Sequence, residues 1–244
     1  MSDTGFNTEA AARFLGVSAA SVRRWSDSGE LPVRRLGRRG TRRFAESDLA
    51  RFRDRQPAPR ALSSNDAVTI GALRLSQHSH LATFYDSDAG RLRLTLPFLR
   101  DGLRAGDACF LVVGARLREL YVAALEHEGI RVEEAIDGGG LTILPGIGPR
   151  TEDALAAWED GFWKAVNRGA RQLRVVGEME SEREAFESEA EMIAYEFAVN
   201  ALIERFPCVA LCQYDVRAFA GSTILGALKA HPGLLGSRLA SALL

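Results

Sequence analysis

Helix start and stop signals follow one another at short intervals near the N-terminus, and this pattern constrains the fold more than any other feature of the chain. Thr8 is suited to cap a first helix, which Gly16 can end. Ser18 is suited to cap a second helix over 19–28, which stops at Gly29. Two short helices joined by a turn that contains glycine predict a helix-turn-helix.

An arginine-rich hairpin is expected directly after these two helices. Residues 33–36 and 41–44 have the composition of short strands and flank a turn at 37–40 that begins and ends with glycine. The arginines of this segment are Arg34, Arg35, Arg38, Arg39, Arg42 and Arg43. A third helix is expected to be capped by Ser47. Two helices followed by such a hairpin predict a winged helix-turn-helix.

A winged helix-turn-helix places its second helix in the major groove and its wing on phosphates or in the adjacent minor groove. A solvated surface is the alternative role for the arginines, but Trp25, Gly37 and Gly40 fall where the winged geometry needs them. The residues expected to bind double-stranded DNA are Ser18, Ser21, Arg23, Arg24, Arg34, Arg38, Arg39, Arg42 and Arg43.

Residues 6–55, about a fifth of the chain, resemble the DNA-binding domain of the MerR-like and excisionase-like group. The matching residues are Thr8-Glu9-Ala10-Ala11, Val17-Ser18, Val22-Arg23-Arg24-Trp25, Gly29-Glu30-Leu31-Pro32, and Arg42-Arg43-Phe44 with Asp48-Leu49. Each motif alone is weak, but the set is specific. The resemblance implies a DNA-binding domain over 1–55.

Charge is divided unequally along the chain. The first 60 residues contain 13 arginines against seven acidic residues, whereas the remainder contains 18 basic and 25 acidic residues. Only the basic N-terminal part is therefore expected to meet nucleic acid. The polar N-terminus and three cysteines, which cannot all pair, favour a cytoplasmic protein. No apolar run reaches the roughly 18 residues that cross a bilayer, so no membrane partner is expected.

Pro57, Pro59 and neighbouring polar residues predict a linker over 56–66, which leaves a second domain over 67–244. Short apolar runs in this domain alternate with stripes of helical spacing. Pro97 should kink or restart the helix in which it lies. Strands are expected at 81–85, 108–113, 141–144, 173–176 and 209–214. The alternation predicts an α/β fold, a parallel sheet with helices on both faces.

Enzyme motifs are missing from this α/β domain. A phosphate loop needs Gly-x4-Gly-Lys-Ser/Thr, and neither Lys164 nor Lys229 lies in that context. No Gly-x-Ser-x-Gly element is present either. Cys208 and Cys212 would be about 13 Å apart on an extended strand, too far to share a metal ion. A metal site would need Cys208 off the strand, with His80 or Cys109 joining it, so neither a metal nor a cofactor is expected.

Ligands of such sheets bind at the carboxyl ends of the strands. Polar residues follow several of the expected strands, although any one of them can equally be a helix cap or a loop residue. These candidates are Tyr85-Asp86-Ser87, Gly114-Ala115-Arg116, Pro145-Gly146, Gly177-Glu178-Met179 and Tyr214-Asp215. His80 lies near the opposite end of the first strand.

Residues of about 70–235 resemble the MEDS domain, the sensory domain of methanogen and methylotroph regulators, which include a dichloromethane-responsive type of repressor. The matching residues are His80 with Phe84-Tyr85-Asp86, Pro97-Phe98-Leu99 with Gly102-Leu103 and Gly106, Gly177-Glu178-Met179, Tyr195-Glu196, Leu211-Cys212-Gln213-Tyr214-Asp215, and His231-Pro232. The resemblance implies a RecA-like fold without a phosphate loop that senses small molecules, especially hydrocarbon derivatives. Carried onto this sequence, the ligand candidates are His80, Tyr85, Glu178, Cys212, Tyr214 and His231, although His231-Pro232 can instead be only a helix terminator.

The sequence thus predicts a regulator that binds DNA through its N-terminal domain and a small organic effector through its second domain. A single small DNA-binding domain makes few phosphate contacts and binds weakly. A homodimer on a palindromic site is therefore expected. The dimer contact should come from the second domain, with the apolar tail 234–244 as a candidate. Two alternatives stay open: an enzyme with an autoregulatory DNA-binding head, and an architectural DNA-binding protein.

Overall fold

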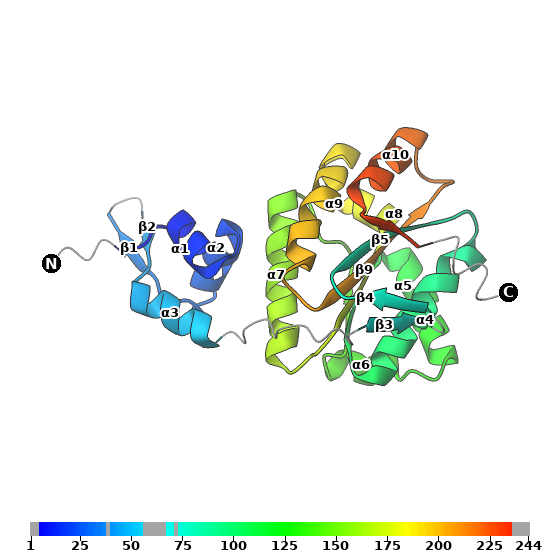
Figure 1. The fold of residues 1–244 in the computed structure, drawn as a ribbon, viewed down its shortest axis with the longest axis horizontal. Coiled ribbons are helices and arrows are strands. Elements are labelled where there is room, and N and C mark those ends of the chain that lie inside the picture. The colour runs from blue at the N-terminus through cyan, green and yellow to red at the C-terminus, as the bar shows by residue number, and fades with distance from the viewer. Residues whose placement is uncertain (1–4, 38–39, 56–66, 71–72, 236–244) are drawn as a thin grey trace.

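The computed structural model describes residues 5–37, 40–55, 67–70 and 73–235. Arg38, Arg39, the expected linker 56–66 and the tail after residue 235 lie outside these ranges. The described chain forms a small head and a larger α/β domain, and the head lies against one side of the larger domain (Figure 1).

The head has the elements of a winged helix-turn-helix. Its helices and strands are α1 (Thr8–Leu15), α2 (Ala19–Asp27), β1 (Arg34–Leu36), β2 (Thr41–Arg43) and α3 (Glu46–Arg55). The strands pair antiparallel, as the hairpin pattern predicts. Ser18 caps α2 as expected, but Asn7, and not Thr8, accepts the capping hydrogen bond of α1. The third helix begins at Glu46, one residue before its expected cap.

A compact apolar core holds the head together. Val22 and Trp25 lie on the inner face of α2, at the spacing of three that one helix face requires. Leu31, Phe44 and Leu49 close around them, and all five side chains are almost fully buried. Because these residues bury the inner face of α2, only its outer face is available to contact a partner.

In the part of the chain that the structure describes, the α/β domain is built on a six-stranded parallel sheet with the order β10-β5-β9-β8-β6-β7. Its strands are β5 (Ser79–Tyr85), β6 (Ala108–Val112), β7 (Leu141–Leu144), β8 (Leu173–Glu178), β9 (Cys208–Asp215) and β10 (Gly233–Leu234). The five strands that the apolar runs predict are confirmed. The sixth, β10, has only two residues and carries no such signal.

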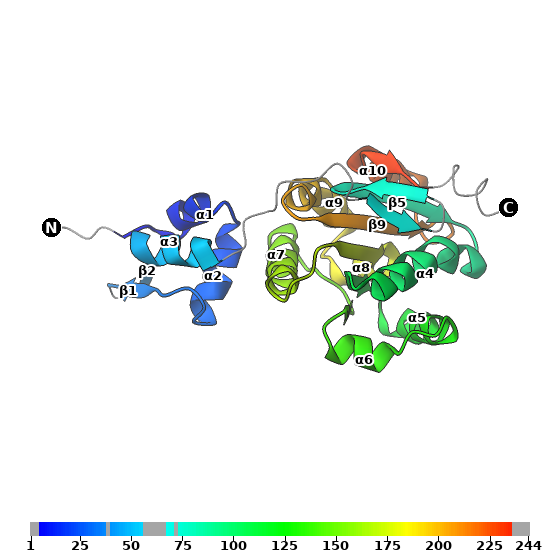
Figure 2. The same ribbon diagram turned by 60° about the horizontal axis from the view of Figure 1, so that its bottom comes forward.

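Helices cover both faces of the sheet (Figure 2). One apolar cluster includes residues of α4 (Asp88–Ala105), α5 (Ala115–His127) and α6 (Val132–Asp137). The other includes residues of α7 (Thr151–Asn167), α8 (Met179–Ala185), α9 (Glu189–Ile203) and α10 (Gly221–Ala230). The doubly covered α/β fold is therefore confirmed. None of the helices in the described ranges is long and apolar enough to cross a membrane.

Two features differ from the sequence expectation. Pro97 lies inside α4, which continues as one helix, so the expected restart of the helix is wrong. An antiparallel hairpin of β3 (Ala67–Ile70) and β4 (Leu73–Ser76) was not expected. It is too short to give a clear strand pattern, yet it buries Val68 and Ile70 against the core beside α4.

Candidate functional site

Strand pairing brings two of the candidate ligand residues together inside the α/β domain. β5 and β9 are adjacent, with Ala82 opposite Cys212 and His80 opposite Ala210. Side chains two residues apart on a strand share a face, so His80 and Cys212 point to the same side of the sheet. Their Nε2 and Sγ atoms lie 3.2 Å apart.

Two helices complete a buried polar cluster at this point. Glu196 extends from α9, and its Oε2 atom lies 3.1 Å from His80 Nε2. His231, the residue that ends α10, brings its Nε2 atom to 2.9 Å from the same oxygen. The rings of His80 and His231 lie 4.1 Å apart between centroids. All of these side chains are at least nine-tenths buried.

A small cavity lies beside this cluster. Its volume is about 10 Å³, which is room for about one water molecule. Trp158 and Phe162 of α7 and Tyr195 of α9 supply aromatic walls, and the Trp158 indole donates a 2.7 Å hydrogen bond to the Tyr195 hydroxyl. A ligand larger than a water molecule could therefore enter this cavity only by displacing a wall residue.

Glu182 contributes an acid to the cavity wall. Its carboxylate accepts a 3.3 Å hydrogen bond from the backbone N–H of Ile147 and is otherwise surrounded by the protein interior. Burial raises the pKa of Glu182 to about 8, because the charged form loses its hydration. The carboxyl group is therefore mostly protonated at neutral pH.

A second polar cluster lies on the opposite face of the sheet. Glu178, at the end of β8, accepts hydrogen bonds from Tyr85, Arg91, Tyr121 and Gln213. Glu178 and Arg91 are both almost fully buried. Among the described side chains, Arg91 Nε and Gln213 Oε1 of this cluster are buried without a hydrogen-bond partner.

The sheet therefore divides the six predicted ligand residues. His80, Cys212, Tyr214 and His231 lie on the cavity side, whereas Tyr85 and Glu178 lie on the other. The sequence patterns did not single out Glu196, Glu182 or Trp158 as site residues. Of the three, Glu196 could most readily have been predicted from the sequence. It is a charged residue within the buried stripe of α9, beside Met192, Tyr195 and Val199.

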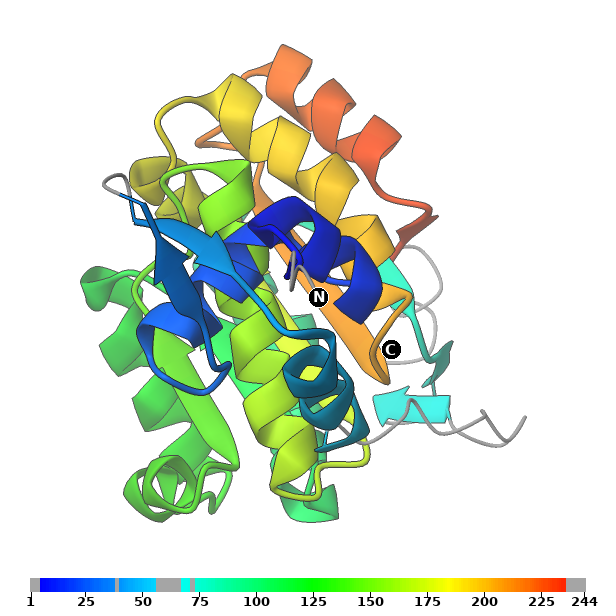
Figure 3. The same ribbon diagram turned by 90° about the vertical axis from the view of Figure 1, so that its left-hand side faces the viewer.

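The head contacts the α/β domain through α2, the helix expected to read DNA (Figure 3). The Ser21 hydroxyl donates a hydrogen bond to the Glu159 carboxylate of α7, and the Ser18 N–H donates to the same carboxylate over 3.3 Å. Arg24 donates to the carbonyl oxygen of Ala156 over 3.3 Å and lies 3.9 Å from Asp160. Three of the expected DNA-binding residues thus face a protein helix.

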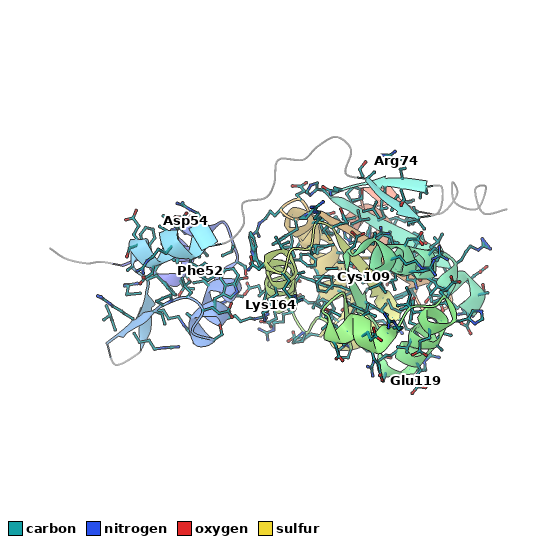
Figure 4. All side chains as sticks on the ribbon, turned by 90° about the horizontal axis from the view of Figure 1, so that it is seen from below. Phe52, Asp54, Arg74, Cys109, Glu119 and Lys164 are labelled. Atoms are coloured by element: carbon teal, nitrogen blue, oxygen red, sulfur yellow. The ribbon has the colours of Figure 1, made fainter. Side chains whose placement is uncertain are left out.

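Aromatic packing extends the contact along α7. Trp163 of α7 packs with the core of the head, and a groove of about 240 Å³ is lined by Trp25, Phe52, Trp163 and Lys164 among others. Figure 4 labels Phe52 and Lys164 on the two sides of this contact. Glu159, which is 1% exposed, also forms a 2.5 Å ion pair with Arg205.

The wing contacts the end of α2. Asp27 forms ion pairs with Arg35 at 2.6 Å and with Arg42 at 2.8 Å. These arginines lower the pKa of Asp27, chiefly through the hydrogen bond from Arg42. These ion pairs hold the hairpin against α2. The two elements expected to contact DNA are therefore fixed in position relative to each other.

Comparison with known proteins shows which protein class combines these two domains. Residues 79–232 match the family described as MEthanogen/methylotroph, DcmR Sensory domain, and residues 6–57 match a helix-turn-helix domain family. The transcriptional repressor DcmR of Methylorubrum extorquens (strain DSM 6343 / CIP 106787 / DM4) is 38% identical over 232 residues, which cover 91% of this chain and 87% of that protein. A helix-turn-helix joined to a sensory domain makes a ligand-responsive DNA-binding regulator and not an enzyme. The chain belongs to the family of the MEthanogen/methylotroph, DcmR Sensory domain.

Proposed function

We propose that this protein is a repressor whose α/β domain senses a small organic molecule and controls whether α2 can reach operator DNA. The single observation that carries the proposal is the hydrogen bond from Ser21 to Glu159. It joins the helix expected to read DNA to a helix that also forms a wall of the buried cavity.

In the structure the head contacts α7, and we call this the docked arrangement. Docking and DNA binding would use the same surface of α2. Ser18, Ser21 and Arg24 are expected to face the major groove, but here they contact α7. Glu159 would also be repelled by DNA phosphates if the head bound a duplex without leaving α7. DNA binding therefore requires the head to leave α7.

Helix α7 offers a direct physical connection between the effector and the head. Trp158 and Phe162 lie on its cavity side, whereas Glu159 and Asp160 contact the head. Because the cavity holds about one water molecule, an effector displaces α7 or its aromatic side chains on binding. An effector that relieves repression must bind more tightly to the docked arrangement than to the DNA-bound one.

We expect the dimer contact to form on the surface of the two neighbouring helices α9 and α10. Phe197 of α9 and Leu225 of α10 are each about half exposed, and Leu228 of α10 is also exposed. Large exposed apolar side chains on adjacent elements are typical of an interaction surface. Two heads in one dimer would double the phosphate contacts on a palindromic operator.

The test is a titration of the full-length protein into fluorescent duplex DNA from its own promoter, with and without small halogenated hydrocarbons. We expect salt-dependent binding that a suitable effector weakens at least fivefold. Failure of the full-length protein to bind any duplex at low ionic strength would refute the proposal. Binding that every tested compound leaves unchanged would refute the expected effector class.

A further inference from the structure

We propose that His80, Glu196, Cys212 and His231 form a four-ligand site for a divalent transition-metal ion, of which Zn²⁺ is the best match. This inference is independent of the function proposed above. It rests on the positions of the ligand atoms, on polar atoms that lack partners and on the hydrogen bonds that orient the two imidazoles.

The ligand atoms converge on one point. One atom from each residue can be chosen so that all four lie within 4.8 Å of one another. Tetrahedral zinc with bonds of about 2.0 to 2.3 Å places its ligand atoms roughly 3.3 to 3.8 Å apart. The distances between ligand atoms here begin at 2.9 Å and do not exceed 4.8 Å, so side-chain shifts in both directions would bring the atoms to tetrahedral spacing. Two imidazoles, one thiolate and one carboxylate are all established zinc ligands.

Several of these atoms have no other partner. Among the described side chains, both Glu196 oxygens and His231 Nε2 are buried without a hydrogen bond of acceptable geometry, although His231 Nε2 lies only 2.9 Å from Glu196 Oε2. Buried polar atoms are nearly always paired, and an orphaned charged group is more costly than a neutral one. A metal ion between these residues would give His231 Nε2 and one of the Glu196 oxygens a partner at once.

The Nδ1 atom of each histidine already has a hydrogen-bond partner. His231 Nδ1 lies 2.8 Å from the carbonyl oxygen of Ala227, which can only accept, so Nδ1 carries the proton. His80 Nδ1 lies 3.0 Å from Asn200 Oδ1, and the Asn200 amide nitrogen donates to the Ala230 carbonyl, which fixes its oxygen as the acceptor. With Nδ1 as the hydrogen-bond donor, each ring can offer its Nε2 atom to a metal ion. Metal-binding histidines are held in this manner.

The charges also balance. A thiolate and a carboxylate supply two negative charges, which a divalent ion neutralises, so the filled site has no net charge in its buried position. Cys208, four residues earlier on β9, is not part of this group of possible ligands among the described residues, and burial raises the pKa of its thiol. Both cysteines lie on β9, where residues four apart are too distant to share an ion, and the proposed site uses Cys212 without Cys208.

The test is cobalt substitution of the full-length protein, followed by absorption spectroscopy. We expect about one Co²⁺ per chain, with the visible bands of tetrahedral cobalt and a thiolate-to-cobalt charge-transfer band. Cys212→Ser should remove the charge-transfer band, whereas Cys208→Ser, a matched change on the same strand, should leave it intact. Asn200→Ala, which releases His80 Nδ1, should weaken binding by about 10- to 100-fold.

Two results would overturn the proposal. The first is the absence of tetrahedral cobalt bands in wild-type protein whose circular dichroism shows it to be folded. The second is a charge-transfer band that Cys208→Ser and Cys212→Ser change equally. If Cys212→Ser does not fold, metal analysis of wild-type protein purified without chelators decides the question, and less than about 0.1 zinc per chain counts against the site. None of these measurements uses DNA or an effector, so failure of the repressor proposal leaves them unaffected.

Discussion

The Ser21 hydroxyl of α2 donates a hydrogen bond to the Glu159 carboxylate of α7, although the two residues are 138 positions apart in the chain. Ser21 is fully buried. A residue predicted to face DNA is therefore covered by the domain predicted to sense the effector.

Glu159→Gln should raise the affinity for duplex DNA. The change removes the charge from a carboxylate that accepts from both Ser21 and Ser18, and hydrogen bonds to charged groups contribute about 1.5 to 3 kcal/mol each. A loss of about 1.4 kcal/mol in docking corresponds to a tenfold shift. We expect five- to tenfold tighter binding in fluorescence anisotropy.

Glu152→Gln is the matched control, because Glu152 is exposed in the first turn of the same helix. It should leave the DNA affinity unchanged. Equal effects of the two variants would show that overall charge, and not docking, governs the affinity. A decrease in affinity for Glu159→Gln alone would show that α7 supports the DNA-bound arrangement.

The wing arginines should set the salt dependence of DNA binding. Changing Arg38, Arg39, Arg42 and Arg43 together to alanine should lower the slope of log affinity against log salt by about 0.9 for each phosphate that the wing no longer neutralises. Arg131→Ala, at an exposed position of the α/β domain, is the control for the removal of a single charge. An unaltered slope in the fourfold variant would mean that the hairpin does not touch phosphates.

Glu182 should make the protein less stable as the pH rises. Its pKa is about 8 in the folded protein against about 4.5 when exposed, so the folded state holds one more proton between these values. The free energy of unfolding should fall by about 1.4 kcal/mol per pH unit in this window. Glu182→Gln should remove that slope in urea titrations at pH 5.5 to 7.5, whereas Glu184→Gln, an exposed change on the same helix, should keep it. Identical slopes in all three proteins would contradict the assigned protonation.

The Glu178 cluster should stabilise the fold without taking part in effector binding. Glu178→Gln leaves the buried Arg91 guanidinium without its main counter-charge, and breaking a buried ion pair costs about 3 to 5 kcal/mol. Denaturant unfolding should show a loss of about 3 kcal/mol, with an unchanged effector concentration for half-maximal DNA release. A stable variant with an altered effector response would instead place the effector on this face of the sheet.

The fold was largely predictable because its signals are local. Gly16, Ser18 and Gly29 mark the ends of the head helices, and the buried parallel strands appear as continuous apolar runs such as 108–113. The hairpin β3–β4 and strand β10 were not predicted because two to four residues give no measurable period. Pro97 was expected to kink or restart its helix, and the restart is wrong because α4 continues through Pro97 as one helix.

The site was less predictable because its partners are distant in sequence. His80 and Cys212 were selected, but only the pairing of β5 with β9 shows that they touch. Tyr85 and Glu178 were grouped with them, and the alternation of side chains across the sheet separates them. The docking of Ser21 on Glu159 depends on how two domains pack, which no local pattern encodes.

The most direct test of the account measures whether DNA removes the head from α7. Spin labels at Asp54→Cys on α3 and Arg168→Cys after α7 occupy exposed positions, while the native cysteines are buried. Pulsed dipolar spectroscopy of the free protein should give one short distance between the labels. Duplex DNA at low ionic strength should replace it with a longer distance, and Glu159→Gln should show a share of the longer distance without DNA. A short distance that persists in the DNA-bound protein would contradict the claim that docking and DNA binding exclude each other.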